Sequence, residues 1–187
     1  MGQRLIFLLG GARSGKSTYA ENWAKDHSDN DAVLFVATAQ AFDDEMRDRI
    51  TAHRASRPPQ WQTVEAPQAV GDAITAQSGP YETVVIDCLT LLVSNILLQL
   101  PEDCTQADAD RAIRHELDTL LAAYQRSQAT WLIISNEVGM GIVPPYRLGR
   151  LYRDALGRAN QQIARHADDV LLLVAGLPWT LKAPQRD

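Results

Sequence analysis

Short, almost continuous apolar runs alternate along this chain with longer stretches whose apolar positions recur at helical spacing. The apolar runs have the length of strands and lack the strict apolar–polar alternation of a half-exposed strand. That pattern is typical of strands buried on both faces of a parallel sheet. The runs occupy residues 4–10, 32–38, 83–88, 130–135 and 169–176, and we expect an edge strand at 178–182.

Four stretches between these runs are predicted to be helices, at residues 16–26, 43–55, 108–126 and 146–167. In the third, Ile113, Leu117 and Leu121 share one face, as in an amphipathic helix. Strands that alternate with helices predict an α/β fold with a mainly parallel central sheet flanked by helices on both faces. No linker interrupts the pattern, so we expect one domain over residues 1–187.

Composition and charge narrow the class of protein. Hydrophobic residues make up 45% of the chain and charged residues 22%, and the net charge of −5 gives no electrostatic case for a nucleic-acid partner. Cys88 and Cys104 form neither a disulfide framework nor a paired metal-ligand spacing. The apolar run at 5–9 is too short for a signal peptide, and that at 89–100 too short and polar to span a bilayer. We therefore expect a cytoplasmic protein without stable membrane insertion.

A glycine-rich loop follows the first predicted strand and opens the first predicted helix. It matches the pattern G-x-x-x-x-G-K-[ST] and consists of Gly10, Gly11, Ala12, Arg13, Ser14, Gly15, Lys16 and Ser17. Its glycines let backbone N–H groups point at phosphate oxygens, Lys16 reaches the β- and γ-phosphates, and the Ser17 hydroxyl suits Mg²⁺. A chance glycine turn is the alternative, but the position between a strand and a helix favours a nucleoside triphosphate site.

Asp87 lies near the end of the third predicted strand and has two interpretations. A carboxylate at a strand end beside such a loop commonly serves Mg²⁺. The same Asp87 would also suit the N-cap of a helix, because the sequence "LTLLVSN" follows closely. The glycine-rich loop favours the metal role.

His53 lies on the apolar face of the predicted helix 43–55, three residues beyond Ile50. The residues alone favour a hydrogen-bonded core histidine. The alternative is chemical, since a neutral imidazole is a good nucleophile toward the α-phosphorus of a nucleotide. Arg54 and Arg57 follow it and are suited to clamp phosphate oxygens, or else form a solvated helix end.

Four longer stretches go beyond these general motifs. They are "GGARSGKS" (10–17), "ATAQAFDDEMRDRITAHRASRP" (37–58), "VVIDCLTLLVSN" (84–95) and "SNEVGMGIVP" (135–144), of which the last is far more specific than the glycine-rich loop. Together they closely resemble the bifunctional adenosylcobinamide kinase / adenosylcobinamide-phosphate guanylyltransferase family of cobalamin biosynthesis. The resemblance runs over nearly the whole chain, to "VAGLPWTLK" at 174–182.

The resemblance implies a P-loop NTPase fold of the RecA-like type and two reactions. A nucleoside triphosphate, ATP or GTP, phosphorylates adenosylcobinamide, and GMP is then transferred from GTP to adenosylcobinamide phosphate, giving adenosyl-GDP-cobinamide. It also implies Mg²⁺, a homotrimer with sites near subunit boundaries, and His53 as the residue that carries GMP. The nucleotide contacts it implies are Gly10 to Ser17, Thr38, Ala39, Gln40, Arg54, Ala55, Ser56, Arg57, Glu65 and Asp87, with Ser17 and Asp87 at the metal.

The sequence departs from the family pattern at two positions. Ala52 stands where some members have a second histidine, and Asp87 where some have glutamate. Asn136 and Glu137 follow a predicted strand, where α/β sheets bind ligands, and we expect a role for them in the site. The alternative functions are a P-loop kinase of another small molecule and a nucleotide-dependent regulatory ATPase or GTPase switch.

Overall fold

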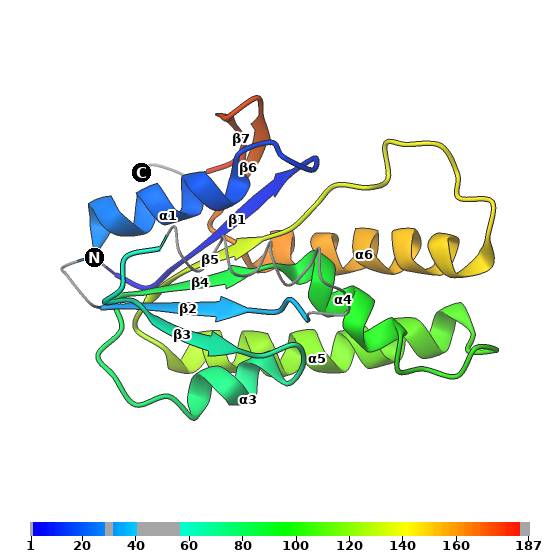
Figure 1. The fold of residues 1–187 in the computed structure, drawn as a ribbon, viewed down its shortest axis with the longest axis horizontal. Helices are drawn as coiled ribbons and strands as arrows, with labels where there is room; N and C mark the ends of the chain where they lie inside the picture. The colour runs from blue at the N-terminus through cyan, green and yellow to red at the C-terminus, as the bar shows by residue number, and fades with distance from the viewer. Residues whose placement is uncertain (1, 29–31, 41–56, 184–187) are drawn as a thin grey trace.

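The computed structural model describes residues 2–28, 32–40 and 57–183, and its centre is a seven-stranded sheet (Figure 1). The strand order is β3-β2-β4-β5-β1-β6-β7. The strands are β1 (Arg4–Gly10), β2 (Val33–Ala37), β3 (Gln62–Glu65), β4 (Thr83–Asp87), β5 (Thr130–Ile134), β6 (Asp169–Val174) and β7 (Leu177–Lys182). Strands β1 to β6 pair with one another in parallel, and β7 pairs antiparallel with β6. The predicted α/β fold with a mainly parallel sheet is confirmed.

The five predicted buried strands and the edge strand at 178–182 all occur, with ends that differ by no more than two residues. The strand that the sequence did not predict is β3. It has four residues, lies at the edge of the sheet and buries none of its side chains fully, so it lacks the apolar run that marks the others.

Three predicted helices are confirmed as α1 (Lys16–His27), α5 (Gln106–Arg126) and α6 (Arg147–His166). The predicted helix at 43–55 lies outside the described residues. Two further helices, α3 (Val70–Thr75) and α4 (Leu89–Leu97), were not among the four predicted, although the N-cap interpretation of Asp87 implied a helix after it. Most residues of α4 are buried, so it shows no amphipathic stripe from which a helix can be recognised.

Apolar side chains of alternate residues along β1 enter two cores, one on each face of the sheet. Leu5 and Phe7 belong to the larger core, which α3, α4, α5 and α6 cover, while Ile6 and Leu8 face the side of α1 (Figure 1). Because both faces are covered, ligand access falls to the edge where the parallel strands end. Strands β1, β4 and β5 adjoin one another there and bring together the ends that carry Gly10, Asp87 and Ile134.

Among the helices that the structure describes, none combines the length and apolar character needed to cross a membrane.

Candidate active site

The glycine-rich loop connects β1 to α1 and is held by two backbone hydrogen bonds from other segments. Gly176 N donates to Ser14 O at 2.9 Å, and Glu137 N donates to Gly10 O at 3.2 Å. Gly15 caps α1 with a φ of +97°, a left-handed conformation that glycine adopts without strain. The loop therefore presents the N-terminus of α1, with its positive dipole end, to the carboxyl edge of the sheet.

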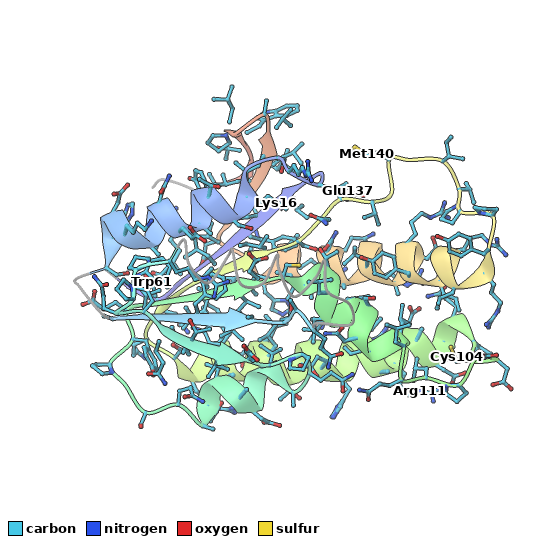
Figure 2. The ribbon with its side chains drawn as sticks, viewed as in Figure 1. Lys16, Trp61, Cys104, Arg111, Glu137 and Met140 are labelled. Carbon is cyan, nitrogen blue, oxygen red and sulfur yellow. The ribbon has the colours of Figure 1, made fainter. Side chains whose placement is uncertain are left out.

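Lys16 is the first residue of α1, and its ammonium lies inside the loop with only 7% of the residue exposed (Figure 2). Nζ donates to Gly10 O at 3.1 Å, to Gly11 O at 2.6 Å and to Ser14 Oγ at 3.4 Å. Burial lowers the pKa of the Lys16 ammonium, and the nearby Cys88 and Asp87 side chains oppose that shift. The Lys16 charge is thus placed at the centre of the loop, close to the end of β4.

Asp87 ends β4 and does not cap the helix that follows. The N-cap of α4 is Cys88, which is extended and makes no capping bond through its side chain. The helix-cap interpretation of Asp87 is therefore wrong, because α4 begins one residue too late for it. Asp87 instead lines a cleft together with Lys16 and Ser17.

This cleft has a volume of about 420 Å³ and is formed at the carboxyl ends of the strands. It is lined by Ala12, Arg13, Lys16, Ser17, Ala37, Ala39, Arg57, Asp87, Cys88, Thr90, Leu91, Ile134 and Asn136. The sequence thus predicted residues that are far apart in the chain and that the fold does bring together. The guanidinium of Arg57 stacks on the Phe35 ring with Cζ 3.5 Å from its centroid, which holds a cation at the cleft.

Other predicted contacts lie elsewhere. Gly10, Gly11, Ser14 and Gly15 shape the loop, and Gln40 and Glu65 are described but are not part of the cleft lining. His53, Arg54, Ala55 and Ser56 lie outside the described residues.

Thr38 is fully buried, and its hydroxyl is hydrogen-bonded to the backbone of Cys88, the residue after Asp87. Thr38 Oγ1 donates to Cys88 O at 2.7 Å and accepts from Cys88 N at 2.8 Å. Asn95 Nδ2 in turn donates to Thr38 O at 2.8 Å. These contacts give Thr38 the position of a residue that holds the ends of β2 and β4 together.

The sequence did not single out Cys88, Thr90 and Leu91 as site residues, although all three line the cleft. Cys88 is the N-cap of α4, and Thr90 and Leu91 lie in its first turn, where no spacing rule marks them. The one signal was their place directly after Asp87, because residues that follow a strand in a parallel sheet reach its ligand-binding edge. Burial and the charge of Asp87 raise the pKa of the Cys88 thiol to about 12, so this thiol stays protonated at neutral pH.

Oxygen donors in the cleft suit a hard cation. Ser17 and Asp87 both line it, and Mg²⁺ is commonly held by one or two oxygen ligands of this kind together with substrate phosphates. Among the described residues, no group of three or more histidine, cysteine, aspartate or glutamate side chains forms a metal cluster. Ser17 and Asp87 could therefore hold a metal ion together with the phosphates of a bound nucleotide.

Known proteins resemble this chain over nearly its whole length. The model of the family described as cobinamide kinase / cobinamide phosphate guanyltransferase matches residues 6–181. The bifunctional adenosylcobalamin biosynthesis protein CobU of Escherichia coli is 43% identical over 183 residues, which cover 95% of this chain and 99% of that protein. The bifunctional adenosylcobalamin biosynthesis protein CobP of Pseudomonas aeruginosa is 39% identical over 175 residues, covering 94% and 95%.

Among solved structures, the flagellar accessory protein FlaH of Methanocaldococcus jannaschii is similar with a TM-score of 0.48 and 13% identity, covering 98% of this chain and 80% of that one. The family match extends over nearly the whole chain and includes every described residue of the cleft. The chain belongs to the cobinamide kinase / cobinamide phosphate guanyltransferase family.

Proposed function

We propose that this protein phosphorylates adenosylcobinamide with a nucleoside triphosphate and then transfers GMP from GTP to adenosylcobinamide phosphate. The observation that carries the proposal is a cleft where Lys16, Ser17 and Asp87 meet, in a chain whose relatives are bifunctional proteins of adenosylcobalamin biosynthesis. Such a cleft holds phosphates by electrostatics and leaves the choice of the attacked phosphorus to the acceptor.

In the first reaction, the acceptor hydroxyl attacks the γ-phosphorus. A new P–O bond forms, the bond to the β,γ-bridging oxygen breaks, and the nucleoside diphosphate leaves with that electron pair while the hydroxyl proton passes to solvent. Backbone N–H groups of the loop and Lys16 stabilise the charge on the phosphate oxygens. Ser17 and Asp87 would hold Mg²⁺ together with the phosphates, and the ion would supply further charge neutralisation.

In the second reaction, the His53 imidazole attacks the α-phosphorus of GTP. A P–N bond forms and pyrophosphate leaves, after which a phosphate oxygen of adenosylcobinamide phosphate attacks the same phosphorus and breaks the P–N bond. Arg57 lines the cleft beside the loop and supplies a fixed cation for the charge that develops on the α-phosphate oxygens. Arg54, Ala55 and Ser56 are proposed to contact the nucleotide with it.

The test is to incubate the protein with α-labelled GTP and Mg²⁺ and then denature it. We expect label on the protein that is labile in acid, stable in base, absent from His53→Ala and absent when EDTA removes the metal. Label that persists in His53→Ala would contradict the role of His53. A P-loop kinase of another small molecule instead predicts γ-phosphate transfer without labelled protein, and a regulatory switch predicts slow hydrolysis that adenosylcobinamide does not change.

We further propose that the protein acts in the cytoplasm as a homotrimer with sites near subunit boundaries. Large apolar side chains are exposed on the β6–β7 hairpin and the segment before α6, with Trp179 at 66%, Met140 at 85% and Ile142 at 96% exposure. Apolar surface of this kind commonly marks a protein–protein contact. A molar mass of one chain by light scattering would contradict the trimer.

A further inference from the structure

A buried asparagine on α6 reaches the end of β5, behind the cleft. Asn160 is only 5% exposed. Its Oδ1 accepts from Ser135 Oγ at 2.7 Å, and its Nδ2 donates to Asn136 O at 3.1 Å. Both ends of this amide are therefore used, as a buried polar group requires.

The backbone of Asn136, a residue that lines the cleft, is fixed by two hydrogen bonds. Asn136 N donates to Thr90 Oγ1 at 2.7 Å, and Asn136 O accepts from Asn160. The peptide groups of Asn136 are thus held by side chains of α4 and α6 rather than by neighbouring strands. A change in the side chain of Thr90 or Asn160 is therefore expected to shift the backbone of Asn136.

A second contact from α6 reaches the side of the cleft formed by Thr90 and Asn136. Tyr152 lies eight residues before Asn160, about two helical turns away and so on a similar face. Its hydroxyl donates to Thr90 O at 3.4 Å, and burial raises the pKa of Tyr152 to about 12. The Tyr152 hydroxyl therefore keeps its proton at neutral pH, and α6 supports both Thr90 and Asn136.

The strand order places Asn136 relative to Asp87 and Lys16. Strand β5 lies between β4, which ends at Asp87, and β1, which leads into the loop of Lys16. Asn136, two residues beyond β5, therefore stands between the proposed metal ligand and the phosphate-binding lysine. That is where the γ-phosphate and the acceptor hydroxyl must meet if the proposed function is correct.

We propose that Asn160 is a positioning residue. By holding the backbone of Asn136, it keeps the Asn136 side chain in the orientation needed for phosphoryl transfer to the acceptor. The inference rests on the proposed function for its kinetic consequence, but not for its geometry. It predicts that Asn160 affects turnover more than nucleotide binding, because Lys16 and the loop, not α6, hold the phosphates.

The decisive variant is Asn160→Asp, which keeps an acceptor for Ser135 but places a carboxylate oxygen against Asn136 O. We expect kcat for adenosylcobinamide phosphorylation to fall about 10–100-fold, while KM for the nucleotide stays within about 3-fold. In an Asn136→Ala background the same substitution should cause no further loss, because the side chain that it positions is gone. An equal loss in both backgrounds would mean a structural role and would overturn the proposal.

Gln162→Ala is the matched control on the same helix. It removes the 2.8 Å bond from Gln162 Nε2 to Asp118 Oδ1, which joins α6 to α5 away from the cleft, and we expect wild-type kcat. If Asn160→Asp does not fold, Ser135→Ala takes its place, because it removes the hydroxyl that holds Asn160 Oδ1. A wild-type kcat for Ser135→Ala would then overturn the proposal.

Hydrogen exchange at the backbone amide of Glu137, which shares a peptide group with Asn136 O and donates to Gly10 O at 3.2 Å, separates this inference from the proposed function. The measurement needs no substrate, so it applies even if the wild-type protein fails to phosphorylate adenosylcobinamide, a result that would reject the proposed function alone. We expect faster exchange in Asn160→Asp or Ser135→Ala, and wild-type exchange in Gln162→Ala. Unchanged exchange in the first two variants would reject the positioning role.

Discussion

The two walls of the cleft are built in different ways. One wall is the glycine-rich loop, where eight consecutive residues from Gly10 to Ser17 supply backbone, lysine and hydroxyl groups. The other wall presents Asp87, Thr90 and Asn136 from two segments that are more than forty residues apart in sequence. The first depends mainly on local backbone conformation, and the second on hydrogen bonds between distant side chains.

The contiguous wall still needs clamps. A Cβ added to Gly10 would lie 2.5 Å from Leu173 O on β6, so this glycine permits the loop to pass close to the neighbouring strand. The bond from Gly176 N to Ser14 O fixes the other end of the loop. The motif therefore encodes the shape of the loop, while β6 and its turn fix the position of the loop on the sheet.

The assembled wall is held from behind by three buried polar residues. Thr38 binds the backbone of Cys88, and Asn95 binds the backbone of Thr38 and, at 3.0 Å, Pro67 O. Asn160 plays the corresponding part for Asn136. Buried, hydrogen-bonded side chains of this kind favour one geometry, because an unpaired partner in the interior is costly.

The largest expected effect tests the contiguous wall. Lys16→Met should lower kcat for both reactions by about 10³-fold, because it removes the charge that we propose to bind the phosphates. The free energy of unfolding should change by no more than about 2 kcal/mol, since methionine fills a similar volume. Kinetics and urea unfolding of the same preparation provide the measurement. A comparable loss of stability and activity would mean that Lys16 mainly supports the fold.

The next effect separates shape from charge in the same loop. Gly10→Ala should destabilise the protein by about 1–3 kcal/mol, because its Cβ would meet both Leu173 O and Ser14 Oγ at 2.5 Å. Gly11→Ala is the matched control for stability, since a Cβ there has nothing within 4 Å. Thermal unfolding compares the two variants. Equal melting temperatures for both would show that the loop has room to move away from β6.

This difference between the walls also explains how far the sequence could predict the site. The loop, Asp87 and the parallel sheet were predictable because each depends on a local pattern: a motif, a strand end and apolar runs. Thr90 and Asn160 were not, because their roles exist only once α4 and α6 pack behind the sheet. Asn136 was expected to take part only from its place after a strand. That residues 1–187 form one domain stays a prediction.

A separate prediction concerns the reactivity of the Cys88 thiol in the assembled wall. With a pKa of about 12, raised by burial first and by the charge of Asp87 second, about 10⁻⁴ of the Cys88 thiol is ionised at pH 8. Alkylation of Cys88 in a Cys104→Ser background should therefore be about 10³-fold slower than for an ordinary cysteine, and should speed up as the pH rises. Unfolding in urea should restore the ordinary rate.

The same labelling compares the two walls directly. Thr38→Val removes the hydroxyl that binds both polar groups of the Cys88 backbone, so Cys88 should react several-fold faster in this variant. Gly10→Ala changes the other wall and should leave the rate close to that of the parent protein. If the two variants expose Cys88 equally, the walls move as one unit, and the distinction between a contiguous and an assembled wall would describe how they are encoded but not how they respond.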